Sequence, residues 1–167
     1  RLDLFWTNYA YDNEAPDATS SGFFISEEGL AVTNYHSIDG SVHALAALST
    51  GESYQVERVL YYDEEIDIAV LRVSRVSVKG KETPAFKYLE LAGSEGARPG
   101  DPVYTLGNPL GLGLAVSAGI ISAVNREVDN YALPCIMNTA DISKGSSGGA
   151  LLNVRGQVIG VTSGAYS

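Results

Sequence analysis

The apolar residues of this chain occur in short runs rich in Val, Ile, Leu, Tyr and Phe. Clusters of Gly, Asp, Asn, Ser and Pro separate these runs. Short apolar runs bounded by turn-forming residues are typical of β-strands, and no stretch has the apolar spacing of a long amphipathic helix. The pattern therefore predicts an all-β chain.

We expect strands in two groups, separated by a stretch that contains Lys, Gly and Pro. They lie near residues 3–8, 21–25, 30–33, 42–48, 53–60 and 67–73, and then near 102–106, 114–124, 133–138, 149–153 and 157–163. Two β-barrels joined by a linker suit this arrangement. We therefore predict one domain over 1–167, with an N-terminal barrel (about 1–77), a linker (about 78–85) and a C-terminal barrel (about 86–167).

Glycine is frequent, with 18 of the 167 residues, and several glycines alternate with other residues in one segment. At Gly107, Gly111 and Gly113 we expect tight turns in which the backbone adopts a positive φ.

Composition limits the classes of function. Hydrophobic residues make up 45% and charged residues 19% of the chain, as in folded globular proteins. The formal charge of -9 leaves no basic stripe for phosphates, so a nucleic-acid partner is not expected.

Cys135 is the sole cysteine, which excludes an intramolecular disulfide, and its apolar neighbours predict an inert thiol buried in a strand. No apolar run approaches the roughly 20 residues of a membrane-spanning helix, and the first residues lack the layout of a signal peptide. Because the chain begins with Arg1 rather than Met, we expect that a signal, an anchor or a domain preceded it.

Ser147 is a candidate nucleophile because small residues surround it. A serine hydroxyl attacks well only with a base to take its proton and with donors that hold the resulting oxyanion. Gly145 allows a turn that points its own N–H and that of Ser147 into one cavity, and we expect Gly148 and Gly149 to leave room for a substrate carbonyl. A Gly/Ser-rich hairpin turn without catalytic function is the alternative interpretation.

His36 is the favoured base for this serine. It follows the apolar run 30–33 and precedes a turn, where its imidazole can project into a cleft and act as general base and then general acid. The other histidine, His43, lies in an alternating stretch that favours an outward or packing role.

Asp67 opens an apolar run, where a carboxylate is costly unless it has a partner. The N–H of a catalytic imidazole is such a partner, although a solvated acid at a strand edge is the alternative. The order His36, Asp67, Ser147 along the chain is that of chymotrypsin-like enzymes.

Motifs along most of the chain from residue 21 onward resemble the trypsin-like protease domain of the HtrA/DegP group and its bacterial relatives. The matching stretches are 21–25, 30–36, 67–71, 100–103, 106–111, 117–122, 145–149 and 156–161. The resemblance implies two packed six-stranded antiparallel β-barrels, with a His36, Asp67 and Ser147 triad in the cleft between them. It implies hydrolysis of peptide bonds through an acyl-enzyme, with no metal or cofactor.

The resemblance also predicts where a polypeptide substrate binds. Its main chain is expected to add as an extended strand along Thr162, Ser163 and Gly164. Asp141 lies six residues before Ser147, the spacing at which trypsin keeps the acid that selects basic residues, whereas Ile142 as an apolar pocket wall suits the aliphatic preference of the HtrA type. Both specificities remain open.

Some features of the family are not found in this chain. A last barrel strand with a Gly-Phe-Ala-Ile-Pro-like pattern, often followed by a PDZ domain, is expected after the segment 157–163, but the sequence stops at Ser167. Ser146 stands where trypsin relatives carry the Asp that pairs with a new N-terminus, so we expect control by ordering of loops 107–113 and 139–146 instead. The resemblance implies an extracytoplasmic protein and leaves a homo-oligomer and an upstream membrane anchor open.

Two other functions compete with the protease. One is a catalytically silent, protease-fold module that binds peptides, and the other is a β-rich adhesion or surface domain in which Ser147 and His36 lie far apart. Reaction with an active-site fluorophosphonate separates the first from an enzyme.

Overall fold

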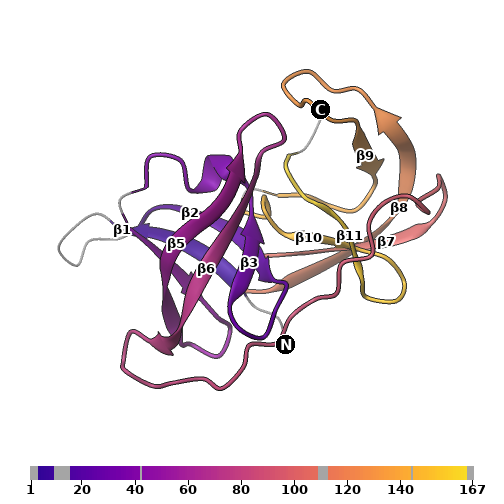
Figure 1. Cartoon of the computed structure of the whole chain (residues 1–167). Helices are drawn as coiled ribbons and strands as arrows, with labels where there is room; N and C mark the ends of the chain where they lie inside the picture. The colour runs from indigo at the N-terminus through magenta and orange to yellow at the C-terminus, as the bar shows by residue number, and fades with distance from the viewer. Residues whose placement is uncertain (1–3, 10–15, 42, 109–112, 144, 165–167) are drawn as a thin grey trace.

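The computed structural model describes residues 4–9, 16–41, 43–108, 113–143 and 145–164. The first unit is a closed barrel in the order β1-β2-β3-β6-β5-β4, and every pair in it is antiparallel (Figure 1). Its strands are β1 Leu4–Tyr9, β2 Pro16–Phe24, β3 Leu30–Thr33, β4 Ala44–Ala47, β5 Ser53–Asp63 and β6 Ile68–Ser77. A 3-10 helix, η1, spans Tyr35–Ser37 after β3.

The second unit is a five-stranded antiparallel sheet in the order β11-β10-β7-β8-β9. Its strands are β7 Pro102–Gly107, β8 Ala115–Arg126, β9 Cys135–Asn138, β10 Ala150–Leu152 and β11 Val158–Val161. Figure 1 shows the two units side by side, with the chain between β6 and β7 running from one to the other. The described residues contain no helix long and apolar enough to cross a membrane.

The predicted all-β class is confirmed, and each predicted strand has a counterpart. The first unit has the six strands of the expected barrel, whereas the second has five in the part of the chain that the structure describes. The largest boundary difference is at β2, which begins at Pro16 rather than near 21. Residues 16–20 lack an apolar pattern and are held as a strand by backbone pairing with β1, as in the pair Thr7 and Thr19.

Alternation along the strands builds two cores from the same segments. On β2 and β3, Phe24 and Ala31 face the interior of the first barrel, whereas Phe23 and Val32 join a cluster with residues of the second unit. Successive side chains of a strand point to opposite faces, so neighbouring residues can serve different cores. The second cluster joins the two units and contains Phe23, Val32, Leu89, Ala150, Leu152 and Val158.

The chain between the units packs against both of them. Phe86 stacks on Phe24 with ring centroids 4.1 Å apart and meets Tyr54 edge-on at 5.0 Å. Leu89 enters the cluster between the units, and Leu91 forms a bridge with Val158 of β11. Residues 86–91 therefore help to hold the two units together.

Of the three glycines predicted to need a positive φ, Gly107 and Gly113 are described, and glycine is favoured at each for a different reason. Gly113 has a φ of 115°, as expected, and Gly111 lies outside the described residues. The prediction for Gly107 was wrong, because its φ is not positive. A Cβ at Gly107 would instead lie 3.1 Å from the Cα of Ser146, so close approach of the backbone is what favours glycine there.

Candidate active site

His36 and Asp67 come together at one end of the first barrel. His36 lies in η1, directly after β3, and Asp67 ends the turn between β5 and β6. The imidazole Nδ1 and the Asp67 Oδ2 are 2.7 Å apart, and the main-chain N–H of His36 donates to Asp67 Oδ1 at 2.8 Å. One carboxylate thus contacts both the ring and the backbone of His36, and this fixes the ring relative to η1.

Asp67 adopts an uncommon backbone conformation, with a φ of 55°. This left-handed region is tolerated by Asp and Asn better than by most other residues. Asn34 supports it, since its Nδ2 donates to the Asp67 carbonyl at 2.9 Å and to Ser163 Oγ at 3.2 Å. Asn34 is fully buried, so this side chain links the His36 and Asp67 pair to the second unit.

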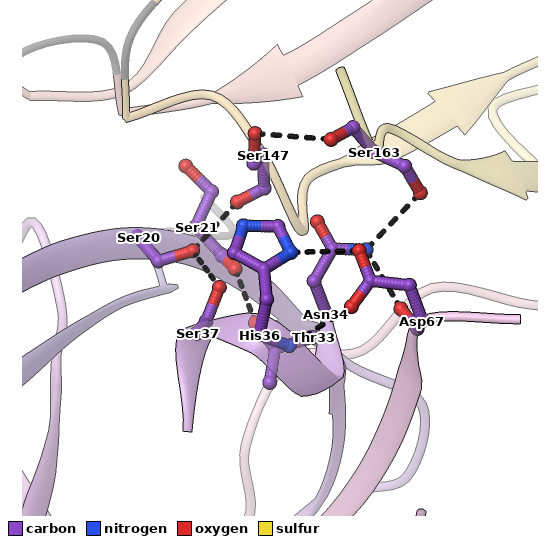
Figure 2. A network of polar contacts seen from close by, with 9 residues as sticks. All are labelled: Ser20, Ser21, Thr33, Asn34, His36, Ser37, Asp67, Ser147 and Ser163. Atoms are coloured by element: carbon purple, nitrogen blue, oxygen red, sulfur yellow. Dashed lines mark hydrogen bonds and ion pairs between the residues drawn. The ribbon is translucent and has the colours of Figure 1, made fainter. Parts of the chain in front are cut away.

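Ser147 lies on the loop before β10, which we call the nucleophile loop (residues 145–149). Figure 2 shows the His36 imidazole between Asp67 and this loop. Ser147 Oγ donates to the Ser163 carbonyl at 3.4 Å, and no hydrogen bond joins Ser147 to His36 among the described residues. The structure therefore brings the three predicted residues together, with the serine hydroxyl turned to Ser163.

Strand β2 holds the nucleophile loop through two consecutive serines. The Ser147 carbonyl accepts the N–H of Ser21 at 2.9 Å and the hydroxyl of Ser20 at 2.8 Å. The Ser21 hydroxyl donates to the Gly145 carbonyl at 2.6 Å. Ser20 also contacts the hydroxyl of Ser37, the residue after His36.

Gly148 and Gly149 have a packing role that was not predicted. A Cβ at Gly148 would lie 2.1 Å from the Ser21 carbonyl oxygen, and a Cβ at Gly149 would lie 1.9 Å from the Leu106 carbonyl oxygen. These glycines let the nucleophile loop approach neighbouring strands, and their role in leaving room for a substrate carbonyl stays a prediction. Gly145 has a φ of 92°, which agrees with the predicted turn at this residue.

The main-chain groups of the nucleophile loop are mostly bonded within the protein. The N–H of Ser146 donates to the Ser143 carbonyl at 2.9 Å, and that of Gly148 donates to the Thr162 carbonyl at 2.6 Å. The N–H of Ser147 has no acceptor among the residues that the structure describes. Within the described part of the chain, this amide is thus left without an internal bond.

The predicted substrate segment divides into two parts. Both main-chain groups of Thr162 are occupied, because its carbonyl accepts from Gly148 and its N–H donates to Gly149 at 2.9 Å. Thr162 therefore cannot pair with a substrate strand, which corrects this part of the prediction. Ser163 is half-buried and Gly164 is exposed.

The two candidate specificity residues differ in exposure. The Asp141 side chain is exposed, whereas Ile142 is half-buried. Asp141 is positioned through its backbone, with its N–H donating to Ser117 Oγ at 2.9 Å. The condition for basic selectivity, a buried carboxylate, is not met by Asp141 in this structure.

Two further groups titrate above their ordinary range. Burial raises the pKa of Tyr131, the negative charge of Asp67 raises it further, and the interaction with Ser163 acts in the opposite direction. The loop of Tyr131 contacts the Asp67 turn, because the Ala132 N–H donates to the Glu65 carbonyl at 2.9 Å. Burial also raises the pKa of the Cys135 thiol, although this residue is only half-buried in β9 rather than fully buried as predicted.

The other groups near the site give no sign of a metal centre. His43 is exposed just before β4. Within the described ranges, no three His, Cys, Asp or Glu side chains lie together in a way that could hold a metal ion.

Comparison with known sequences identifies the family. The family described as trypsin-like peptidase domain matches residues 20–161, which is most of the chain. The chain belongs to this family. The predicted resemblance to the HtrA/DegP group is also confirmed, since relatives named DegP-like and HTRA1 match 91% and 96% of the chain.

Two of these relatives are serine proteases by name. The chain is 36% identical over 158 residues to a probable periplasmic serine endoprotease DegP-like of Rhizobium meliloti, a match that covers 91% of this chain and 29% of the relative. It is 34% identical over 165 residues to serine protease HTRA1 of Xenopus tropicalis, with 96% and 34% covered. The chain thus spans about a third of the length of these trypsin-like relatives.

Solved structures of the group have the same fold. The HtrA-type protease AlgW with decapeptide superposes with a TM-score of 0.82 at 27% identity, over 99% of this chain and 56% of that chain. AlgW with tripeptide superposes with a TM-score of 0.80 at 31% identity, over 96% and 49%. The trypsin-like arrangement of the two units is therefore shared with known peptidases.

Sequence reasoning overlooked Asn34 and Ser21 as parts of the site. The one available signal was their polar character beside apolar runs, at 30–33 for Asn34 and at 23–25 for Ser21. Buried polar side chains need partners, but the sequence does not say which partners they find.

Proposed function

We propose that this chain is the catalytic domain, over 1–167, of a serine endopeptidase that cleaves polypeptides through an acyl-enzyme. The observation that carries the proposal is the double contact of the Asp67 carboxylate with His36, at 2.7 and 2.8 Å, beside the loop of Ser147. Membership of the trypsin-like peptidase family supports it.

Ser147 is the nucleophile and His36 the general base. For attack, Ser147 Oγ gives up its long bond to the Ser163 carbonyl and donates to His36 Nε2, which takes the proton as Oγ bonds to the substrate carbonyl carbon. Asp67 accepts from Nδ1, so it holds the ring in the tautomer with a free Nε2 and stabilises the imidazolium. His36 then returns the proton to the leaving amine, and water completes hydrolysis of the acyl-enzyme.

The oxyanion binds the N–H groups of Gly145 and Ser147. The N–H of Ser147 supports this assignment, because it has no acceptor among the described residues and a preorganised donor receives the developing charge without rearrangement. Removing one such donor typically lowers kcat by about a hundredfold to a thousandfold.

The substrate main chain lies along Ser163 and Gly164, and the side-chain pocket selects aliphatic residues. The exposed Asp141 and the half-buried Ile142 favour an apolar pocket over a basic-selective one. Polypeptides as substrates agree with the peptide complexes of AlgW, and an extracytoplasmic location agrees with the periplasmic names of DegP-like relatives.

Hydrolysis of unfolded casein tests the proposal, with every cut mapped by mass spectrometry. The chain is compared with Ser147→Ala, and both are treated with a fluorophosphonate. We expect cuts after small aliphatic residues and labelling of Ser147, with both lost in the variant. Cuts after Lys and Arg would instead support selection by Asp141.

A chain that neither cleaves nor reacts would contradict the proposal and favour the silent peptide-binding module. The same measurement on a longer natural chain, which includes residues after Ser167, is the control for contributions from outside residues 1–167.

A further inference from the structure

Every polar group of Ser21 has a partner in the network around the nucleophile loop. Figure 2 shows two of these partners, Ser147 and Thr33. The residue is fully buried, and its hydroxyl donates to the Gly145 carbonyl at 2.6 Å and accepts the Asn108 N–H at 2.8 Å. Its N–H donates to the Ser147 carbonyl at 2.9 Å, and its carbonyl accepts the Thr33 hydroxyl at 2.7 Å. Any residue could make the two main-chain bonds, but the two hydroxyl bonds require a side chain like that of serine.

These bonds fix the peptide planes on both sides of the Ser147 amide. The peptide from Gly145 to Ser146 is held by Ser21 Oγ at its carbonyl and by the Ser143 carbonyl at its N–H. The peptide from Ser147 to Gly148 is held by the Ser21 N–H at its carbonyl and by Thr162 at its N–H. The peptide between them carries the Ser147 N–H, and its carbonyl, that of Ser146, accepts the Gly149 N–H at 3.1 Å. The direction of the Ser147 N–H therefore depends on this bond and on the two neighbouring peptides.

We propose that the Ser21 hydroxyl is a positioning group, which aims the Ser147 N–H at the oxyanion and couples the nucleophile loop to Asn108, the residue after β7. This inference rests on the proposed function. Ser21 does not touch substrate: it acts through the Gly145 carbonyl. A fully buried hydroxyl that links two separate segments holds them in one relative position, because leaving either partner unsatisfied is costly.

Replacement of Ser21 by Ala removes only the two hydroxyl bonds. The Gly145 carbonyl and the Asn108 N–H then lose this partner, and the peptide from Gly145 to Ser146 keeps only the bond of its N–H to the Ser143 carbonyl. We expect kcat to fall by about tenfold to a hundredfold, the range for small misplacements of catalytic groups, while KM changes little.

The second readout is the affinity for a peptide aldehyde, which forms a hemiacetal with Ser147 and places its oxygen at the oxyanion donors. Across the Ser21 variants this affinity should fall in parallel with kcat/KM, whereas a merely structural role would leave it unchanged in the folded fraction. Ser77→Ala is the matched control. Ser77 is also buried, and its hydroxyl accepts a backbone N–H, that of Lys81 at 3.1 Å. It lies at the end of β6 opposite to the Asp67 turn.

If Ser21→Ala does not fold, Ser21→Cys is used for the same measurements. It fills a similar space but offers a weak donor, so kcat should also fall. Wild-type kcat and aldehyde affinity in a folded Ser21 variant would overturn the inference. A wild-type chain that shows no hydrolysis and no fluorophosphonate labelling would instead contradict the proposed function itself, so the two failures are distinguishable.

Discussion

His36 and Asp67 come from one barrel and are joined by the Asp67 carboxylate, whereas Ser147 comes from the second unit and is placed by its main chain. Two hydrogen bonds join Asp67 to His36 within the first barrel. The nucleophile loop is instead held by its own carbonyl and N–H groups, which bond to β2 and to Thr162. We therefore expect the function of the His36 and Asp67 pair to depend most on the functional groups of its side chains. The stability of the nucleophile loop should depend most on the space available to its backbone.

Among changes to the His36 and Asp67 pair, Asp67→Asn should lower kcat the most. The amide cannot accept from Nδ1 as a carboxylate does, so His36 loses the tautomer and the charge stabilisation that the base needs. We expect kcat to fall roughly ten-thousandfold with little loss of folded protein. Steady-state kinetics and circular dichroism check this, and a fall of less than about tenfold would contradict the role of Asp67.

Among changes to the nucleophile loop, Gly149→Ala should lower the stability of the protein the most. The added methyl meets the Leu106 carbonyl oxygen, so the backbone must move, and we expect the free energy of unfolding to drop by about 3 kcal/mol or more. Gly96→Ala is the matched control, because neither glycine has a positive φ and nothing lies within 4 Å of the Gly96 position. Equal midpoints for the two variants in urea unfolding would show that the loop is not tightly packed.

Asn34→Ala tests the link between the two regions, because Asn34 bonds to both the Asp67 turn and Ser163 of the second unit. Its loss leaves the Asp67 carbonyl without this donor, so we expect a loss of about 1–3 kcal/mol in stability together with a lower kcat. Asn153→Ala is the control, since the Asn153 side chain also bonds to the backbone: its Oδ1 accepts the N–H groups of Arg155 and Gln157, away from the site. If kcat is unchanged in both variants, Asn34 has no role in the active site.

Substitution of Cys135 should have the smallest effect on activity. Its raised pKa keeps the thiol protonated to a higher pH than an ordinary cysteine, and the thiolate is the reactive form. Alkylation by iodoacetamide should therefore be slower than that of a model peptide and should accelerate at higher pH. Cys135→Ser should leave casein hydrolysis unchanged, and faster alkylation than in the peptide would contradict the assignment.

The strands and the three candidate catalytic residues could be predicted from local features of the sequence. Alternating apolar residues around Phe24, Ala31 and Leu71 mark strands because burial selects every second position. His36, Asp67 and Ser147 were predictable because their chemistry is unusual beside apolar or glycine-rich runs. The length of β2 was not, since residues 16–20 form a strand only through pairing with β1.

The sequence by itself determined the all-β fold, the two groups of strands and the residues able to perform acyl transfer. Only the tertiary structure decided what Ser21, Asn34, Gly148 and Gly149 do. The partners of Ser21 lie far away in the chain, since Ser21 and Gly145 are 124 positions apart, and the space around Gly149 is set by the carbonyl of a neighbouring strand. Local patterns report burial and turns, but the partner of a buried polar group and the room beside a glycine exist only after the two units have packed together.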